Sequence, residues 1–471
     1  MRIQLFTAFA CTLLLAGCGT TGKTDDGESF RNSFVQVSPE DPHYFRLSDG
    51  QPYIPIGCNL AAMGTVEKME HYMKMLHENG GNFARVWLNT DLFEIETVYG
   101  QIDTAKLERI DRLLELADEY GIKIKFCIES FRHIRPGKNQ WDTKASYHVS
   151  NGGPFTDADD YITSDRGHEE FLNRVRIFKE RYGDNPAVFG WEMWNEMNAV
   201  ETPEEHLREW NVYMLPEVKK IFPKNLVMQS LGSLDRESSF PIYGYINRLP
   251  SNEVAQVHRY LDEGAELPVC SAPVDSLASD AIAVLKRMDL GKPMLLAESG
   301  AVKPVHTGPH GIYKVDTCGT VLHDVLFAPF FSGAAGPGHL WHWDHHIDKQ
   351  HTWFQIRRFA NAVEGLDPAK EHFVPLRRDT GRLRVYMLKG DNTAMVWCRD
   401  TVSTWKSELE EGIPAEEISG AVIDLTSDLK DRKIRSVSVY DPWKDAWSGL
   451  GRKTAVRLPD FKRSVIVKIE Y

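Results

Sequence analysis

Several patterns that define common enzyme classes are missing from this 471-residue sequence. Its seven cysteines include no CxxC pair, so a cysteine-bound metal centre is excluded. No Gly-rich phosphate turn follows the first predicted strand and no G-x-S-x-G motif occurs, which argues against a dinucleotide-binding fold and a serine hydrolase. Positive charge is also scarce, with 55 Lys and Arg against 67 Asp and Glu, a net charge of −12 and no basic cluster. Nucleic acid is therefore not an expected partner, and a neutral ligand is favoured.

Long apolar runs are absent beyond the first residues. "MRIQLFTAFACTLLLAGC" has one early cation, a short apolar run and then small residues, which is typical of a secretory signal. "LAGC" resembles a bacterial lipobox, in which Cys18 would be the lipidated first residue of the mature protein. We expect a lipoprotein signal over 1–18, a flexible tether over 19–35, and a lipid-anchored place in the bacterial cell envelope, at the outer membrane. A soluble secreted protein cut nearby is the alternative.

The cysteines outside this leader are scattered. At most two disulfides could form among Cys58, Cys127, Cys270, Cys318 and Cys398. Because Cys58 and Cys127 lie in strand-like runs, we expect both to be buried free thiols.

Short apolar runs alternate with amphipathic helical segments from residue 45 onward. In the segment 105–121, Leu107, Ile110, Leu113, Leu114 and Ala117 recur at helical spacing. Strands are predicted over 53–60, 82–88, 122–130, 187–195, 225–231, 253–260, 293–299 and 338–344. Eight strands, most of them followed by a helix, predict a (β/α)8 TIM barrel over 36–370, with a doubly wound parallel sheet as the competing α/β fold.

The pattern changes in the last hundred residues. Strands without intervening helices are predicted over 372–378, 383–390, 393–400, 434–442 and 464–471. They predict a small C-terminal β-sandwich over 371–471, which either completes the fold or binds carbohydrate.

Two long loops are predicted at the carboxyl ends of the barrel strands, where barrel active sites lie. One spans residues 131 to about 166, and the other follows the seventh strand. Both are expected to wall the mouth of the barrel. The first carries aromatic residues that are predicted to stack on sugars: Trp141, Tyr147, Phe155 and Tyr161.

Two carboxylates each end a strongly apolar strand. Glu196 follows "AVFGWEMWN" at the end of the fourth strand, and Glu298 ends "PMLLAE" in the seventh. Glycoside hydrolysis needs such a pair, since one neutral acid protonates the leaving oxygen while an ionised partner attacks the anomeric carbon or activates water. The two strand ends therefore indicate a glycosidase site at the barrel mouth.

The sequence resembles the clan A retaining glycoside hydrolases, close to the family 5 cellulases and mannanases, over about residues 45 to 365. The resemblance rests on five short motifs: "RVW" at 85–87, "WNE" at 194–196, "HRY" at 258–260, "AES" at 297–299 and "LWHW" at 340–343. It implies that Glu196 is the acid/base and Glu298 the nucleophile. It also implies that Arg85 lies beside the nucleophile and keeps it ionised.

The same resemblance implies a set of substrate-binding residues. Asn195 would bind the 2-hydroxyl of the sugar in the reacting subsite, and His258 and Tyr260 would line the site with the Tyr hydroxyl near the nucleophile. Trp343, rather than Trp341, would be the platform for the apolar face of the sugar. The expected substrate is a β-linked polysaccharide or oligosaccharide, a β-mannan or β-glucan, with neither cofactor nor metal.

Other interpretations remain open at this level. Glu129 also ends a strand and is the next candidate for the acid, whereas Glu192 is expected to be a buried network carboxylate. The histidines and acids of "HLWHWDHHIDKQH" (339–351) could indicate a metal-dependent hydrolase, although the first strand lacks the usual His-x-His. His258 could also be a core histidine. A non-catalytic, carbohydrate-binding barrel is the alternative from a different functional class.

Overall fold

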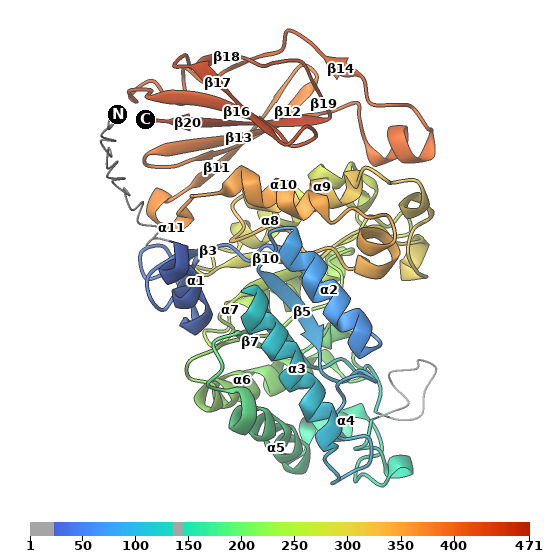
Figure 1. Ribbon diagram of the computed structural model, residues 1–471. Helices are drawn as coiled ribbons and strands as arrows, with labels where there is room; N and C mark the ends of the chain where they lie inside the picture. Colours follow the sequence, from blue (N-terminus) through green and yellow to red (C-terminus); the bar gives the residue numbers. More distant parts are fainter. Residues whose placement is uncertain (1–22, 135–144) are drawn as a thin grey trace, which may run out of the picture.

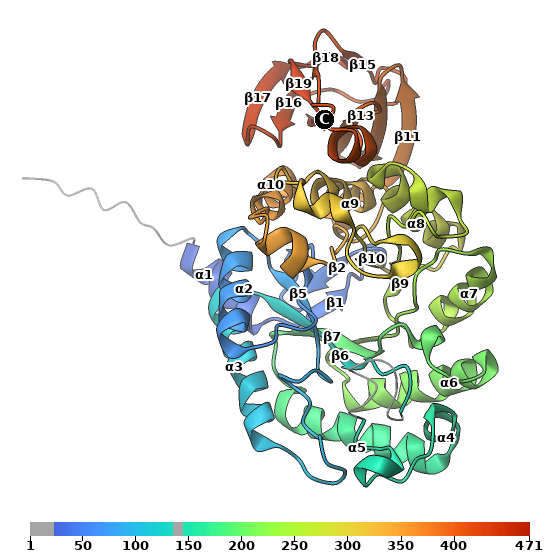
Figure 2. The same ribbon diagram turned by 90° about the vertical axis from the view of Figure 1, so that its right-hand side faces the viewer.

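The computed structural model describes residues 23–134 and 145–471, so Cys18 and Trp141 lie outside the described residues. Seven parallel strands form the central sheet of the larger part of the molecule (Figures 1 and 2). Five pair in sequence order: β4 (Gly57–Asn59), β5 (Phe83–Trp87), β6 (Lys123–Glu129), β7 (Val188–Trp194) and β8 (Leu226–Met228). Two more pair with each other: β9 (Ala255–His258) and β10 (Met294–Glu298).

The sheet closes on itself through backbone hydrogen bonds. The Glu253 N–H donates to the Val227 carbonyl (3.0 Å), which connects β8 to the start of β9. At the other side, the residues 338–341 lie between β10 and β4 in the place of an eighth strand. Ser299 N–H donates to the His339 carbonyl (3.1 Å), and Asn59 N–H donates to the Leu340 carbonyl (3.1 Å). The barrel prediction is confirmed, and the doubly wound alternative is wrong because an open sheet would leave these edges unpaired.

The eighth predicted strand is the least regular of the set. Of residues 338–344 only Leu340 makes a parallel bridge, with Ser299, and a π-helical turn begins at Trp343. The apolar and aromatic run is therefore too long to be read as one strand, because the chain leaves the barrel wall after Trp341.

Helices surround the strands as a ring, which Figure 2 shows nearly along the barrel axis. They are α2 (Val66–Glu78), α3 (Thr104–Tyr120), α5 (Asp165–Tyr182), α6 (Glu204–Ile221), α7 (Phe240–Arg248), α8 (Val274–Arg287), α9 (Thr320–Phe331) and α10 (Phe354–Val363). The apolar stripe predicted for α3 is buried, as its helical period requires. The ends of α3 follow local signals, since the Asp103 side chain caps its first turn and Gly121 ends it with φ of 64°.

The amino end of the barrel is covered by residues that precede β4. Helix α1 (Lys23–Asn32) leads into a three-stranded antiparallel sheet of β1 (Val35–Val37), β2 (Phe45–Leu47) and β3 (Pro52–Tyr53). The Lys123 ammonium, at the start of β6, donates to the carbonyls of Phe30 (2.8 Å), Ser33 (2.8 Å) and Pro186 (3.0 Å). Part of the segment predicted as a flexible tether is thus a helix that is held against the barrel.

The last hundred residues form a β-sandwich, as predicted. Its main sheet is antiparallel with the order β11-β12-β13-β20-β16-β17, and it follows the short helix α11 (Pro368–Glu371). These strands are β11 (Val374–Thr380), β12 (Leu383–Lys389), β13 (Thr393–Asp400), β16 (Ser436–Asp441), β17 (Ala446–Gly451) and β20 (Ser464–Glu470). The second layer consists of two pairs: β14 (Glu417–Ile418) with β19 (Phe461–Lys462), and β15 (Val422–Asp424) with β18 (Ala455–Arg457). A separate apolar core fills the space between the layers.

The other face of the main sheet packs on barrel helices (Figure 1). Trp397 of β13 stacks against Phe327 of α9 with ring centroids 5.9 Å apart, and both belong to the same core as the barrel. All twelve residues of α9 are buried, since the barrel covers one side and the sandwich the other. A largely apolar helix that is buried on every face has no amphipathic period, which is why the sequence did not predict it.

Charged side chains also cross this interface. Asp275 of α8 accepts from the Arg384 guanidinium of β12 at 2.5 and 2.8 Å and from the Tyr386 hydroxyl at 2.8 Å. Asp324 of α9 binds Arg399 of β13 at 2.8 and 3.1 Å. Barrel and sandwich are thus joined by buried, hydrogen-bonded ion pairs as well as by apolar packing.

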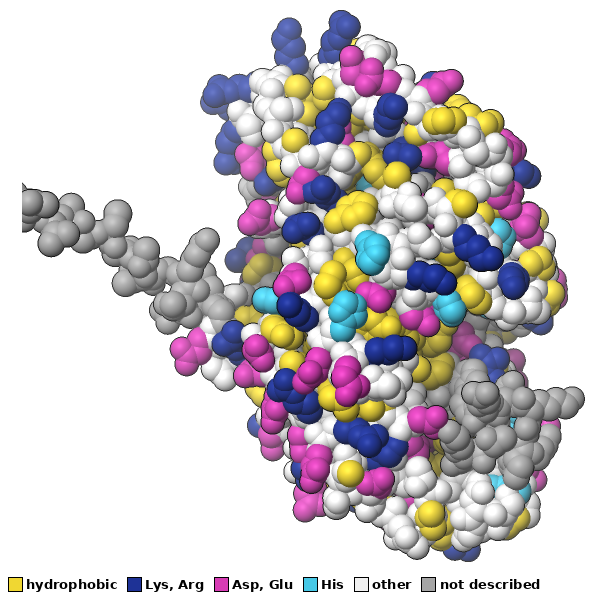
Figure 3. Space-filling model, turned by 45° about the vertical axis from the view of Figure 1, so that its right-hand side comes forward, with side chains coloured by type: hydrophobic (Ala, Val, Ile, Leu, Met, Phe, Trp, Pro, Cys, Tyr) yellow, Lys and Arg dark blue, Asp and Glu magenta, His cyan; other side chains and the backbone are white. Residues whose placement is uncertain are grey.

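The cysteines within the described residues are free, and all but Cys318 are buried, as expected for Cys58 and Cys127. Among the helices of residues 23–134 and 145–471, none has the length and apolar character needed to cross a bilayer. Over the barrel part of the face in Figure 3, Lys and Arg side chains are interspersed with Asp and Glu.

Replacing Asp275 by Ala is expected to destabilise the whole chain by roughly 3–5 kcal/mol, because the buried Arg384 would lose its partner. Urea unfolding followed by tryptophan fluorescence would measure the loss. The exposed pair of Arg176 and Glu169 is the control, since Arg176→Ala should cost no more than about 1 kcal/mol. Equal effects of the two substitutions would contradict the assigned role of Asp275.

Candidate active site

Glu196 lies just beyond the carboxyl end of β7. The strand is buried along its whole length, and the chain then turns at Glu196, whose φ of 48° is in the left-handed region. Such a conformation is strained for a residue with a Cβ and persists only where surrounding contacts hold it. The Glu196 N–H donates to the Ser230 hydroxyl oxygen (3.1 Å), and the Met197 N–H donates to the Ser230 carbonyl (3.3 Å). These contacts hold the carboxylate toward the centre of the barrel mouth.

Glu298 is the last residue of β10 and also points into the mouth. The register between β10 and β9 shifts between Leu296 and Glu298, which places Glu298 opposite His258. One oxygen of its carboxylate accepts from Arg85 Nη1 (2.5 Å), and the other accepts from the Tyr260 hydroxyl (2.6 Å). Two strong donors thus fix the orientation of the carboxylate.

Arg85, on β5, is completely buried and organises the floor of the site. Its Nε and Nη2 atoms donate to the two oxygens of Glu192 at 3.1 and 2.5 Å. Nη2 also donates to the Asn195 amide oxygen (2.8 Å), and Nη1 to the Asn59 amide oxygen (3.1 Å). The guanidinium therefore joins Glu192 below the site to Glu298 at its surface.

Glu192 is a buried network carboxylate in this structure, as predicted from its position below the strand end. Besides Arg85 it binds the Lys125 ammonium (2.9 Å) and accepts from the Ser230 hydroxyl (2.7 Å). Burial raises the pKa of Glu192, but the charges of Arg85 and Lys125 act against it and leave the pKa well below its usual range. Glu192 is thus ionised and fully engaged, with no oxygen facing the cavity.

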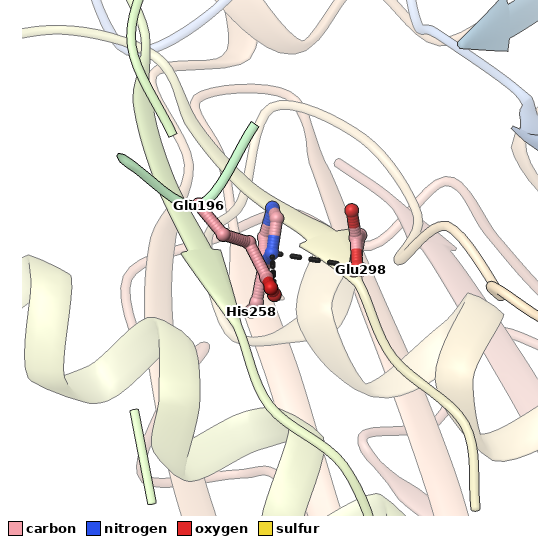
Figure 4. A group of neighbouring side chains, drawn as sticks. All are labelled: Glu196, His258 and Glu298. Carbon is pink, nitrogen blue, oxygen red and sulfur yellow. Dashed lines mark hydrogen bonds and ion pairs between the residues drawn. The ribbon is translucent and has the colours of Figure 1, made fainter. Parts of the chain in front are cut away.

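His258 lies between the two strand-end carboxylates (Figure 4). Its Nδ1 atom is 3.0 Å from an oxygen of Glu196 and 3.4 Å from an oxygen of Glu298. The nearest ligand atoms of the three residues all lie within 4.8 Å of one another. This separation fits the close carboxyl pair of retaining glycosidases, about 5–5.5 Å, rather than the wider spacing of inverting enzymes.

The surroundings of Glu196 favour its ionised form. Burial raises the pKa of the carboxyl, but the hydrogen bond and charge of His258 and the charges of Arg132 and His306 act against it and lower the pKa to about 2. The Arg132 guanidinium is in direct contact, with Nη2 2.5 Å from Glu196 Oε2. In this state of the protein Glu196 is an anion held by two donors.

A cavity of about 940 Å³ opens above the pair. Its lining includes Asn195, Tyr260, Trp87, Trp341 and His342, with further polar side chains from the loops after β8, β9 and β10. Trp343 does not line it, so the choice of Trp343 as the sugar platform is wrong. The chain leaves the barrel wall after Trp341, and Trp343 turns into the core with 5% of its surface exposed.

Several other expectations for the mouth are also corrected. Tyr147, Phe155 and Tyr161 of the long loop and of helix α4 (Ala158–Thr163) are buried and pack on each other, so they cannot stack on a sugar. Glu129, the rival acid, is buried against Arg174 (3.1 Å) and the Tyr147 hydroxyl (2.5 Å) and does not line the cavity.

The histidine-rich segment after the barrel wall is dispersed rather than clustered. His339 is buried beneath the site, where it stacks on Phe83, and His346 is bonded to the buried Asp316 (2.9 Å). Of the histidines of this segment, only His342 lines the cavity. Within the described residues, ligand atoms close enough to hold a metal ion occur in two groups: Glu196 with His258 and Glu298, and the more exposed Glu263 with His310 and Glu410. Neither group contains a residue of the segment 339–351.

Some residues of the site carry no recognisable sequence signal. Arg132 follows β6 in an irregular segment, and Asp262 binds the backbone N–H groups of Val305 (3.0 Å) and His306 (3.3 Å), two consecutive left-handed residues. This turn places the His306 ring edge-on to Tyr260, with centroids 5.0 Å apart. Neither spacing nor periodicity links these loops, which meet only in the closed barrel.

The fold and site together define a class: a (β/α)8 barrel with two carboxylates at the ends of its fourth and seventh strands. Comparison with known families agrees, since the model described as cellulase (glycosyl hydrolase family 5) matches residues 48–309, more than half of the chain. The chain belongs to glycosyl hydrolase family 5, and its enzyme class is that of the O-glycosyl hydrolases.

Relatives and solved structures agree with this assignment. The chain is 25% identical over 333 residues to mannan endo-1,4-beta-mannosidase 7 of Arabidopsis thaliana, which covers 62% of the chain and 74% of that protein. It is 25% identical over 188 residues to mannan endo-1,4-beta-mannosidase F of Aspergillus clavatus, covering 35% of the chain and 40% of the relative. The chain thus spans only about two fifths of the length of the Aspergillus relatives it matches.

The fold is shared with solved structures over nearly the whole chain. A glycoside hydrolase family 5 protein from Bacteroides vulgatus superposes with a TM-score of 0.58 at 13% identity, covering 94% of each chain. The endo-beta-1,4-mannanase from Thermotoga petrophila superposes with a TM-score of 0.51 at 16% identity, covering 89% of this chain and 98% of that one.

Glu192→Gln is expected to lower the free energy of unfolding by roughly 3–5 kcal/mol, because Arg85 and Lys125 would lose a buried counter-ion. The pH dependence should change as well. Since the Glu192 pKa is depressed in the folded state, its contribution is complete above about pH 4.3, the usual value for Glu, and is lost as the pH falls below it. The free energy of unfolding should therefore fall less between pH 7 and pH 3 in the variant than in the wild type. An unchanged slope would contradict this assignment, and Glu169→Gln at an exposed pair is the control.

Trp341→Ala is expected to raise the KM for oligosaccharides by up to about tenfold, because the sugar would lose a stacking partner. Trp343→Ala is the matched control: it should lower the melting temperature and leave the KM unchanged. Steady-state kinetics beside thermal unfolding would separate the two effects. A KM that responds to Trp343 alone would restore the original choice of platform.

Proposed function

We propose that this chain is a retaining glycoside hydrolase that cleaves β-1,4-linked mannan, with Glu196 as acid/base and Glu298 as nucleophile. The observation that carries the proposal is the close approach of these two carboxylates, whose nearest oxygens lie within 4.8 Å at the mouth of a family 5 barrel. The spacing is closer to the roughly 5–5.5 Å of retaining enzymes than to the roughly 6.5–9.5 Å of inverting enzymes, so direct attack on the anomeric carbon is favoured.

The surroundings of Glu298 support the role of nucleophile. Arg85 and the Tyr260 hydroxyl each donate to one oxygen, which stabilises the carboxylate and directs it into the cavity. In the first step Glu298 would bond to the anomeric carbon while Glu196 passes its proton to the leaving oxygen. In the second step Glu196, now a carboxylate, would take a proton from the water that releases the sugar.

Asn195 and His258 fit supporting roles. The amide oxygen of Asn195 accepts from Arg85, which orients the amide NH2 group; among the described residues that group has no hydrogen-bond partner. It is therefore the natural donor to a sugar hydroxyl next to the reacting carbon. His258 contacts both carboxylates and is positioned to hold them at a fixed separation.

Mannan is favoured over other β-glycans by the relatives, whose names describe mannan endo-1,4-beta-mannosidases. The cavity is suited to a polysaccharide, because its lining combines the rings of Trp87, Tyr260 and Trp341 with many polar side chains that can bind hydroxyl groups. The expected lipid anchor at Cys18 would keep such an enzyme at the cell envelope.

The test is hydrolysis of β-mannan, β-glucan and aryl β-glycosides by the wild type and by Glu298→Ala and Glu196→Ala. Cleavage of mannan should fall by at least about a thousandfold in Glu298→Ala. In Glu196→Ala, aryl glycosides with good leaving groups should retain a rapid first step, because their departure needs little acid assistance.

Glu129→Gln is the matched control at another strand end, and its turnover should remain close to wild type if the variant stays folded. Thermal unfolding would confirm the folded state of each variant. Turnover of mannan that survives in Glu298→Ala would reject the assignment. Cleavage of β-glucan but not of mannan would retain the mechanism and change the substrate.

A further inference from the structure

The contact between Arg132 and Glu196 connects the proposed acid/base to a cation outside the five sequence motifs. Arg132 follows β6, and its Nη2 atom lies 2.5 Å from Glu196 Oε2. The main chain at Arg132 is fixed, since the Phe131 carbonyl accepts from the Trp194 indole (2.8 Å) and the Arg132 carbonyl accepts from the Glu201 N–H (2.8 Å). The guanidinium is 33% exposed and lines the cavity, whereas the Glu196 side chain is 12% exposed. The cation thus sits where an approaching substrate would reach it.

We propose that Arg132 is a positioning residue that holds Glu196 as a carboxylate in the free enzyme and must release it before Glu196 can act as the acid. The inference rests on the proposed role of Glu196. A carboxylate bound to a guanidinium cannot donate a proton to a glycosidic oxygen. The substrate must therefore displace Arg132 from Glu196 Oε2, and Glu196 must take up one proton from solvent as the ion pair opens.

The proton balance of the cycle follows from this arrangement. The proton taken up on substrate binding goes to the leaving oxygen when the glycosidic bond breaks and the bond to Glu298 forms. Glu196 is then a carboxylate again and can re-form its contact with Arg132. Glu196 next takes a proton from the attacking water as the bond between Glu298 and the sugar breaks, and it returns that proton to solvent when product leaves and Arg132 binds once more.

The charged and titratable groups facing Glu196 come from every surrounding strand end. They are Arg132 after β6, Glu192 of β7 through Ser230, His258 and Tyr260 at β9, Glu298 of β10 with Arg85 behind it, and His306 after β10. Of these groups, Arg85 is bound to Glu192 and Glu298, and His258 is shared between Glu196 and Glu298. Arg132 is the permanent charge that acts on Glu196 at contact distance.

The pH profile of kcat/KM tests this role, because its alkaline limb reports the acid of the free enzyme. With β-1,4-mannan oligosaccharides, Arg132→Gln should move the alkaline limb upward by at least about one pH unit, so that kcat/KM on that limb rises about tenfold above wild type. Arg132→Lys should retain most of the wild-type profile. A gain in kcat/KM at high pH is a result that local structural damage would not produce.

Arg236→Gln is the matched control, since Arg236 lines the same cavity but binds Asp235 (3.0 Å) rather than Glu196. Its alkaline limb should stay at the wild-type pH whatever happens to its KM. An unmoved limb in a folded Arg132→Gln protein, or the same shift in Arg236→Gln, would overturn the inference. Glu196→Gln separates this failure from that of the proposed function: if it retains wild-type turnover on mannan, Glu196 is not the acid/base and the proposed function itself is wrong.

Discussion

The buried guanidinium of Arg85 is the interaction on which the site depends. An unpaired charge at this depth would be costly, and the structure offsets that cost with Glu192, Glu298 and two amide oxygens. Because these partners come from β4, β7 and β10, a single side chain fixes the relative positions of strands far apart in the sequence. Glu298, the proposed nucleophile, is thereby placed by the same contact that pairs the buried charge of Arg85. Any change in the barrel wall that moved Arg85 would move Glu298 with it.

The contacts that hold Glu196 differ in kind from those that hold Glu298. Glu298 is held by buried donors, whereas Glu196 is held by one buried histidine and one partly exposed arginine. The buried contacts are rigid because no solvent can replace them, while the exposed one can be exchanged for a ligand. Glu298 is therefore held in one arrangement, whereas the contacts of Glu196 can change, and this is the difference that the two proposed roles require.

The sequence predicted the barrel and the strand-end carboxylates because each rests on local information. Period-2 and period-3.6 patterns mark strands and helices, and Glu196 and Glu298 follow apolar runs that end abruptly. It misassigned Trp343 because the run 338–344 keeps its apolar character after the chain has left the barrel wall. Tyr147, Phe155 and Tyr161 were misread for the opposite reason, since a loop can bury aromatics against its own helix without any periodic signal. Arg132 and His306 reach the site through loop geometry, which depends on how the whole barrel closes.

The twelve buried residues of α9 have a consequence for how this chain can be divided. A catalytic barrel that is merely tethered to an accessory module can be cut from it or recombined with another. Here α9, the helix after β10, is buried against both neighbours, so removing the sandwich would expose to water the faces of Phe327 and Phe331 that pack on Trp397. The sequence pattern changes near residue 371, but the solvent-excluded core continues across this boundary. Barrel and sandwich are therefore expected to unfold together rather than as two independent parts.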